Sequence, residues 1–329
     1  MRIVGRIVTT LRAAVLSMRW LLLLTLLVAL HSVLSYCATS VLSPTRSKRL
    51  RARDNAKGFL TFADIGNYGR LGNQLFQVAS TIGIAEHNSM SWAFPEHIEN
   101  TTVGELFGIT GRRLDSLINF EYTEKDQLYY DISLSPPPGK AVSIKGYFQS
   151  PRYFQYSSAS LRSVFKIQSH IQREVTKRVP EVRLRNSVTL HVRRGDYKKL
   201  NHMYNLLEPE YYINALTRLK AIDVVIIVSD DIRWCQNNLG PRIRHRVVYS
   251  PFSEQKYDFT LLYLGKHSIL ANSSFSWWSA YLKYLLKPKA LRGKVFAPRP
   301  WYNVSGQYAN LNVKEFYPMD WVVLDILSP

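Results

Sequence analysis

Short apolar runs alternate with segments of helical spacing throughout the second half of the chain, and this rhythm limits the possible folds. Ser187–Val192 and Val224–Val228 are runs of apolar or β-branched residues, typical of strands buried on both faces of a parallel sheet. Between them, Pro209–Leu219 carries its apolar residues on one helical face. The same pattern predicts strands at 246–249, 268–271 and 295–297 and helices at 233–238, 255–264 and 277–286. Five short strands alternating with helices predict an α/β fold with a doubly wound parallel sheet.

The first half opens with one unit of the same kind. Phe59–Phe62 is a predicted strand, residues 66–72 form a glycine-bearing loop, and Gln74–Ala85 has the pattern of a helix. Trp92–Pro95 is a candidate second strand, and the pattern then weakens towards the Pro-rich segment Ser135–Gly139.

We therefore expect two α/β domains, an N-terminal one at 59–182 and a second at 183–329. Two such domains favour a ligand in the cleft between them, at the carboxyl ends of the strands.

An uncharged stretch precedes these units. Residues 20–45 contain no Asp, Glu, Lys or Arg, and Trp20–Leu30 is strongly apolar. As a helix, ~20 such residues would cross the ~30 Å hydrocarbon core of a membrane. One alternative is a cleaved signal peptide, but the basic segment before the apolar stretch is long for one. The other alternative is a transit peptide, which would be amphipathic, whereas this stretch is not. We expect an uncleaved transmembrane signal-anchor at 20–41, a cytosolic tail at 1–19 and a stem at 42–58.

Charge and cysteine usage exclude several classes of protein. The chain has 43 Lys and Arg against 24 Asp and Glu, a net charge of +19. Residues 1–53 hold nine of the basic residues and no acid, which leaves 34 against 24 in the rest. That part shows no basic-aromatic stripe, so we expect no nucleic-acid partner, whereas an anionic substrate or membrane surface fits. The sequence has only two cysteines, Cys37 and Cys235, which excludes a disulfide scaffold and a four-thiolate zinc site.

The segment His191-Val-Arg-Arg-Gly-Asp196 stands where a predicted buried strand ends. Because side chains alternate along a strand, its two arginines cannot point the same way. We expect one to enter the cleft and the other, paired with Asp196, to brace the loop. A guanidinium matches phosphate oxygens bidentately, so the segment is a candidate phosphate site. The alternative is a solvated basic turn.

Two further segments follow strands at the same predicted sheet edge. Asn272-Ser-Ser-Phe-Ser-Trp-Trp-Ser279 precedes an apolar helix, and its polar groups with the helix N-terminus can bind an anion. The alternative is ordinary helix capping, with Trp277 and Trp278 in the core. Asp230-Asp231 follows a third strand and is suited to a base or ribose, although Asp is also common in turns.

The loop before the first helix, Gly69-Arg-Leu-Gly-Asn-Gln74, fits neither the dinucleotide nor the P-loop fingerprint. It presents Arg70, Asn73 and backbone N–H groups at a helix start. The sequence contains no Asp-x-Asp, no cluster with metal-ligand spacing and no Gly-x-Ser-x-Gly elbow. We therefore expect neither a metal nor another cofactor.

Taken together, these motifs resemble the galactoside α-1,2-fucosyltransferases of glycosyltransferase family 11. His191–Asp196 fits the His-x-Arg-Arg-x-Asp signature shared by α-1,2-, α-1,6- and protein O-fucosyltransferases. The other segments that resemble the family are Arg70–Gln77, Gly146–Gln149, Ser229–Asp231, Asn272–Trp278 and Pro318–Trp321. Residues 97–145 match poorly, and we expect acceptor choice to reside there.

The resemblance implies a GT-B-like pair of Rossmann-type domains and a type II Golgi membrane protein with a luminal catalytic domain. It implies inverting, metal-independent transfer of L-fucose from GDP-fucose to the 2-hydroxyl of a galactose-terminated glycan. Another fucosyltransferase activity, protein O-linked or α-1,6, and an inactive Golgi carbohydrate-binding protein are the alternatives.

The family also implies roles for individual residues. Arg193 would hold the β-phosphate as the principal catalytic residue, with Asn73 and Asp196 as further catalytic candidates. The implied donor-binding residues are His191, Arg194, Arg70, Gly72, Asp230, Asp231, Asn272, Ser273, Ser274 and Ser276. Three Asn-x-Ser/Thr sequons lie beyond the anchor and suit a luminal body. Asn100 and Asn303 are the expected glycan acceptors, because Asn272 falls inside the donor site.

Overall fold

The computed structural model describes residues 58–114, 117–125, 131–135, 140–306, 308–309, 313–318 and 320–326. All of them belong to one compact unit, Asn55–Pro329. The predicted tail, anchor and nearly all of the stem lie outside the described residues. Within the described part of the chain, no helix has the length and apolar character needed to cross a membrane.

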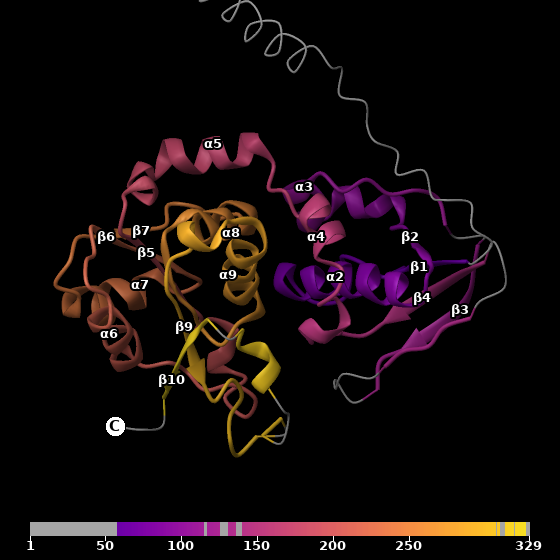
Figure 1. The fold of residues 1–329 in the computed structure, drawn as a ribbon. Helices are drawn as coiled ribbons and strands as arrows, with labels where there is room; N and C mark the ends of the chain where they lie inside the picture. The colour runs from indigo at the N-terminus through magenta and orange to yellow at the C-terminus, as the bar shows by residue number, and fades with distance from the viewer. Residues whose placement is uncertain are drawn as a thin grey trace, which may run out of the picture. The chain divides into compact units, whose positions relative to one another are not determined.

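The first sheet is parallel and has the strand order β2-β1-β4-β3 (Figure 1). Its strands are β1 (Phe59–Thr61), β2 (Ser91–Trp92), β3 (Ile118–Thr123) and β4 (Ala141–Lys145). Helix α2 (Leu71–His87) connects β1 to β2, and α3 (Thr102–Phe107) and α4 (Ser158–Val164) complete this part. The predicted first strand and helix are confirmed, whereas the strand expected to reach Pro95 ends at Trp92.

The second sheet contains six parallel strands in the order β10-β9-β8-β5-β6-β7. The strands are β5 (Ser187–Val192), β6 (Val224–Ser229), β7 (Val247–Tyr249), β8 (His267–Ile269), β9 (Val295–Arg299) and β10 (Val322–Asp325). If these six strands are numbered 1 to 6 in chain order, the sheet read from β7 to β10 has the order 3-2-1-4-5-6. This is the arrangement of a Rossmann-like sheet. The predicted parallel α/β fold is therefore confirmed, and the order reverses between β5 and β8.

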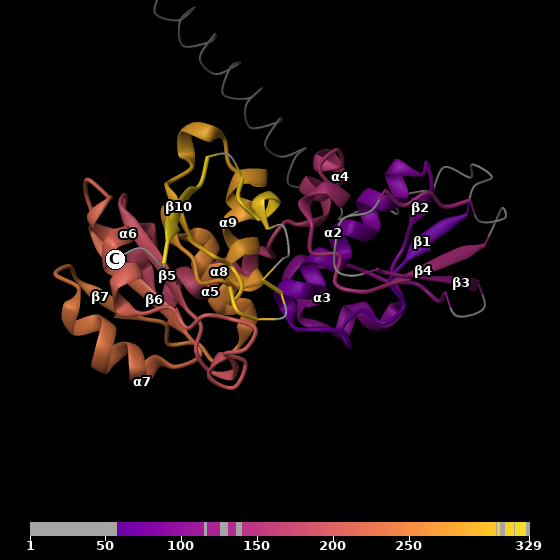
Figure 2. The same ribbon diagram turned by 90° about the horizontal axis from the view of Figure 1, so that it is seen from below.

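Helices cover both faces of the second sheet, as Figure 2 shows from below. They are α5 (Ser169–Arg178), α6 (Pro209–Thr217), α7 (Ile232–Trp234), α8 (Gln255–Leu264) and α9 (Ser274–Leu286). Val224, Ile226 and Val228 of β6 pack with residues of α5 and α8. Val225 and Ile227 pack on the other face with residues of α6. Burial on both faces explains why β6 is an uninterrupted apolar run.

Helices α2 and α9 lie against each other and join the two sheets (Figure 1). Phe76 of α2 packs on Trp277 and Trp278 of α9, with ring centroids 4.9 and 5.1 Å away. Both tryptophans are fully buried. This aromatic contact holds the start of α2 beside the start of α9.

Replacing Gly83 of α2 by alanine should change the stability in the direction opposite to that expected from helix propensity. A Cβ at this position would lie 2.1 Å from the Tyr153 carbonyl oxygen and 2.6 Å from Phe154 Cα, so the backbone itself would have to shift. Gly83→Ala should therefore destabilise the protein by about 1–3 kcal/mol, although alanine favours a helix. Urea unfolding of the purified protein measures this free energy.

Thr217→Ala is the control, because Thr217 is an exposed residue of α6 with no such contact. Its unfolding free energy should change by less than about 0.5 kcal/mol. A Gly83→Ala variant as stable as the parent protein would contradict the close packing of α2 on the segment 151–154.

Candidate active site

A pocket of about 560 Å³ lies where the carboxyl ends of the second sheet's strands face the start of α2. Residues that follow β5, β6, β7 and β8 all line it. The switch point of a doubly wound sheet, here between β5 and β8, is the usual place for a ligand. Of the predicted site residues, the lining includes Arg70, Gly72, Asn73, His191, Arg193, Asp196, Asp230, Asn272, Ser273 and Ser274, but not Arg194, Asp231 or Ser276.

Arg193 is held in the pocket by two carboxylates. Its Nη2 lies 2.6 Å from Asp196 Oδ1 and its Nη1 lies 2.8 Å from Asp230 Oδ2. The side chain is 16% exposed and lies over the Tyr197 ring, 5.4 Å from its centroid. A guanidinium has five N–H groups, more than these two ion pairs require, so Arg193 can also donate to a ligand.

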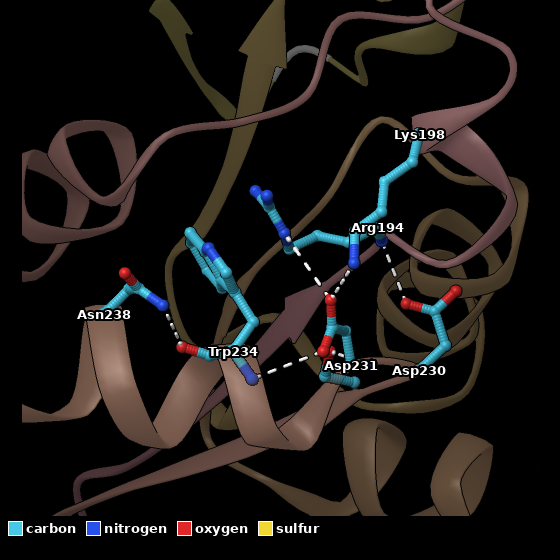
Figure 3. A network of polar contacts seen from close by, with 7 residues as sticks. Arg194, Lys198, Asp230, Asp231, Trp234 and Asn238 are labelled. Atoms are coloured by element: carbon cyan, nitrogen blue, oxygen red, sulfur yellow. Dashed lines mark hydrogen bonds and ion pairs between the residues drawn. The ribbon is translucent and has the colours of Figure 1, made fainter.

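Arg194 points to the other face of the sheet. Its guanidinium lies 3.8 Å from the centroid of the Trp234 ring, and its Nε is 3.8 Å from Asp231 Oδ2 (Figure 3). The expected pair between Arg194 and Asp196 is therefore wrong, because Asp196 contacts Arg193 and, at 3.5 Å, Arg70. The short 3₁₀ helix Asp196–Lys198 turns the Asp196 carboxylate back towards Arg193.

Asp231 also faces away from the pocket and caps a helix. Its Oδ1 accepts from the Trp234 N–H at the start of α7, and its Oδ2 lies 2.6 Å from Lys198 Nζ (Figure 3). The hydrogen bond from Lys198 lowers the pKa of Asp231. The ordinary turn-and-cap explanation therefore describes Asp231, whereas Asp230 lines the pocket.

Asp230 approaches the loop closely at Gly195. Asp230 Oδ1 accepts from the Arg194 N–H at 2.9 Å, and its other oxygen pairs with Arg193. A Cβ on Gly195 would lie 2.6 Å from Asp230 Oδ2. One carboxylate thus fixes both the loop backbone and the guanidinium that enters the pocket.

His191, the last but one residue of β5, is a neutral group. Burial, and then the charge of Arg193, lower its pKa to about 3. Its ring lies 5.4 Å from the Phe275 ring, and its Nδ1 is buried without a hydrogen-bond partner among the described residues. The neutral imidazole can contact a ligand but does not serve as a cation near pH 7.

The segment at the start of α9 divides into pocket and core. Asn272 is fully buried, donates to the carbonyls of Asn205 and Trp301, and keeps Oδ1 without a hydrogen-bond partner among the described groups. Ser273 is the N-cap residue and lines the pocket beside Ser274. Ser276 is buried and its hydroxyl donates to the Ala271 and Ser273 carbonyls, so it stabilises the first turn.

The start of α2 completes the opposite wall. Asn73 Oδ1 accepts from Ser274 Oγ at 2.9 Å and from Gln149 Nε2 at 2.8 Å, which links both parts of the molecule. A Cβ on Gly72 would lie 2.5 Å from the Phe275 nitrogen, so glycine permits this approach. Arg70 is mostly exposed at the pocket rim.

The Gly146–Gln149 segment, quoted above only for its resemblance, delivers two lining residues. Glu124 accepts from the backbone N–H groups of Tyr147 and Phe148, at 2.6 and 2.9 Å from its nearer oxygens. Gly146 adopts φ +149, and a Cβ there would lie 2.4 Å from Glu124 Cβ. This turn directs Tyr147 and Gln149 into the pocket.

Several lining residues were not predicted. Tyr197 and Tyr204 stack with centroids 4.2 Å apart, and Tyr302 lies 5.5 Å from Tyr204. Burial raises the pKa of Tyr204 to about 12, so its hydroxyl stays protonated. Asp258 of α8 is also in the lining, and burial raises its pKa to about 6. These residues come from the connection after β5, from α8 and from the segment after β9, so no single motif in the sequence groups them.

The predicted glycan acceptors differ in accessibility. Asn100 is exposed. Asn303 is half-buried, and its Nδ2, the atom that would carry a glycan, donates to the Asn201 carbonyl at 2.7 Å.

Among the residues that the structure describes, no group of three or more His, Cys, Asp or Glu is placed to hold a metal ion.

Curated proteins with similar sequences carry names from sugar transfer. An Escherichia coli α-1,2-colitosyltransferase is 33% identical over 195 residues, 56% of this chain and 63% of that protein. The Bos taurus galactoside 2-alpha-L-fucosyltransferase SEC1 is 28% identical over 65% of this chain and 62% of its own. This chain thus spans less than two thirds of either relative. The Bos taurus galactoside alpha-(1,2)-fucosyltransferase 2 is 26% identical over 71% and 72%.

A solved structure shares the fold. The crystal structure of POFUT1 in complex with GDP superimposes with a TM-score of 0.50, at 12% identity, over 74% of this chain and 99% of that chain. Its sequence identity is too low to compare site residues. The sequence carries the family assignment: a family model described as glycosyl transferase family 11 matches residues 37–285. That range is well over half of the 329 residues, and the protein belongs to glycosyl transferase family 11.

Proposed function

We propose that this protein transfers L-fucose from GDP-fucose to the 2-hydroxyl of a galactose-terminated glycan, with inversion and without a metal ion. The observation that carries the proposal is Arg193, a preorganised cation at the switch point beside the start of α9. The names of the relatives supply the sugar and the acceptor class. Two Rossmann-like halves around the pocket would form a GT-B-like arrangement.

The diphosphate of the donor would bind between Arg193 and the first turn of α9. Arg193 would donate N–H groups that its two ion pairs do not require, and the α9 N-terminus supplies backbone N–H groups next to Ser273 and Ser274. When the bond between fucose C1 and the phosphate oxygen breaks, negative charge grows on GDP. Fixed donors that already point at that oxygen stabilise it without reorganisation.

The guanosine would occupy the part of the pocket that follows β6 and β7. Phe252 lines this region, and Asp258 provides a carboxylate that receives a hydrogen bond from the Ser250 hydroxyl. A carboxylate accepts the two adjacent N–H groups on the edge of guanine. Asp230 lies between this region and Arg193, near the expected ribose.

Fucose and the acceptor would meet at the opposite end, near Asn73, Arg70 and Tyr204. Tyrosine rings offer apolar faces with hydroxyl tips, which suits a sugar. The acceptor hydroxyl would attack C1 from the side opposite GDP, so that one bond forms as the other breaks and the configuration inverts. Asp196 is the candidate that takes the hydroxyl proton, since it lines this end and is partly exposed.

We further propose that residues 20–41 anchor the protein in the Golgi membrane with residues 59–329 in the lumen. The uncharged stretch and the exposed sequon at Asn100 support this topology. The alternative function is transfer of a different sugar, which is suggested by the name of the Escherichia coli relative, a colitosyltransferase.

The donor and acceptor are tested with the purified protein. Labelled GDP-fucose and a panel of β-galactosides should yield a product with fucose on the galactose 2-hydroxyl, as determined by linkage analysis. GDP-colitose, and acceptors for protein O-linked or α-1,6 transfer, serve as the competing substrates. Preferential transfer to any of those, or no transfer at all, would contradict the proposal. Excess chelator should leave the rate unchanged, whereas loss of activity restored by Mn²⁺ would refute the metal-independent mechanism.

Arg193 yields a graded prediction for catalysis. Removing a fixed donor from a developing anion costs about 3–4 kcal/mol, so Arg193→Ala should lower turnover by about 10²–10³. Arg193→Lys should recover part of the rate, because lysine keeps the charge but lacks the planar fork. Turnover and GDP affinity measure both effects.

Arg194 is the matched control, since it neighbours Arg193 but packs on Trp234 outside the pocket. Arg194→Ala should lower the melting temperature, with a smaller effect on turnover than Arg193→Ala. An Arg193→Ala variant with the turnover of the parent protein would show that Arg193 does not hold the leaving group. A larger loss of turnover in Arg194→Ala than in Arg193→Ala would show the same.

The topology is tested on sealed microsomes. Protease added from outside should spare residues 59–329 and should digest them only after detergent is added. Digestion without detergent would place the body in the cytosol and would reject a luminal site.

A further inference from the structure

A second pocket, of about 580 Å³, opens at the amino end of the second sheet, away from the candidate active site. Ser187 at the start of β5 and Lys266 just before β8 line it, whereas Arg193 and Asn272 follow the other ends of these strands. A six-residue strand spans about 17 Å, so the two pockets are separate. A volume of this size suits a small-molecule ligand.

The lining of this pocket is strongly basic. It contains five cationic side chains and no Asp or Glu, the cations being Arg173, Arg183, Arg185, Lys266 and Lys287. None of the five forms an ion pair with a carboxylate in the described part of the chain. Arg193 in the active site, by contrast, is compensated by two aspartates.

Neutral groups position three of these cations. Lys266 Nζ donates to the Leu291 carbonyl at 3.1 Å, Lys287 Nζ donates to the Tyr263 carbonyl, and Arg183 donates to Thr176 Oγ1. Carbonyl and hydroxyl oxygens orient a cation without neutralising its charge. Burial, and then the charge of Lys266, lower the pKa of Lys287 to about 8.

Apolar side chains complete the lining. Val182 is buried, whereas Leu184 and Leu291 are 40% and 62% exposed and are among the most exposed large hydrophobic residues described. Large side chains of this kind usually avoid water. The pocket therefore offers multiple positive charges next to exposed apolar surface.

We propose that this pocket binds a ligand that carries phosphate groups, independently of the donor in the active site. Arginine forks match phosphate oxygens, and Lys266 and Lys287 add point charges. Two sources share this chemistry, a soluble polyphosphate and the headgroup of an anionic lipid. The proposal does not depend on the transferase reaction.

Calorimetric titration of the full chain with inorganic pyrophosphate tests the proposal. The pocket variant is Arg173→Ala with Arg185→Ala, two exposed residues outside the active site. The control is Lys177→Ala with Arg244→Ala, which removes the same charge from exposed positions outside the pocket. Both variants retain the active site, so any binding of pyrophosphate there cancels from the comparison.

We expect the pocket variant to lose one binding event or to bind at least about tenfold more weakly, while the control binds like the parent protein. Melting temperatures of the three proteins verify that each is folded. Equal binding by the pocket and control variants would refute the proposal, as would the absence of binding to the parent protein of both pyrophosphate and the lipid probe.

A water-soluble, short-chain phosphatidic acid, titrated in the same way, distinguishes the two sources. Tighter binding of this lipid than of pyrophosphate, weakened by Leu184→Ser with Leu291→Ser, would identify a lipid headgroup. Tighter binding of pyrophosphate, unaffected by the two leucine substitutions, would identify a soluble polyphosphate.

Discussion

The side-chain alternation of β5 determines where the chemistry of this protein can occur. Val188, Leu190 and Val192 pack on the α6 side of the sheet, so His191 belongs to the other side. The same alternation continues past the strand end, which sends Arg193 towards the pocket and Arg194 towards Trp234. Since β5 is paired on both sides, with β6 and β8, it cannot slip without moving its neighbours.

The contact between α2 and α9 gives the pocket its second wall. Gly72 lets the two helix starts approach, and Asn73 joins Ser274 of α9 to Gln149 of the other wall. The aromatic packing of Phe76 on Trp277 and Trp278 fixes the same pair of helices from within the core. The tryptophans of α9 therefore pack in the core, whereas Asn272, Ser273 and Ser274, which precede them in sequence, line the pocket.

Local pattern predicted those features that depend on neighbours in sequence. Strand β5 has its predicted bounds, and β6 extends only one residue beyond its apolar run. Helix α9 begins at Ser274, three residues before the predicted start, because Ser273 takes the N-cap position. Strand β3 was not predicted, since most of its residues are exposed and several are polar. Asp196 pairs with Arg193, and not with Arg194 as predicted, because of the 3₁₀ helix Asp196–Lys198. The hydrophobic periodicity of the sequence does not reveal such a turn.

Features that depend on distant segments could not be predicted. Tyr302 meets Tyr197 and Tyr204 only because the segment after β9 and the connection after β5 converge on one edge of the sheet. The five cations of the second pocket are likewise brought together by α5, the β5 start and the ends of α8 and α9. Spacing along the chain cannot group segments that are about 80 or more positions apart.

The two pockets differ most in how their positive charge is balanced. In the candidate active site, Asp196 and Asp230 hold Arg193 in place, but their two negative charges exceed its one positive charge, so a diphosphate would meet no net positive charge in this cluster. Additional attraction must then come from the α9 N-terminus and from Arg70, whose link to Asp196 is long at 3.5 Å. Such a site gains selectivity from geometry, because an anion must match fixed donors and is not attracted by net charge alone. The second pocket has no such compensation, and its attraction for anions would be correspondingly less selective and more sensitive to salt.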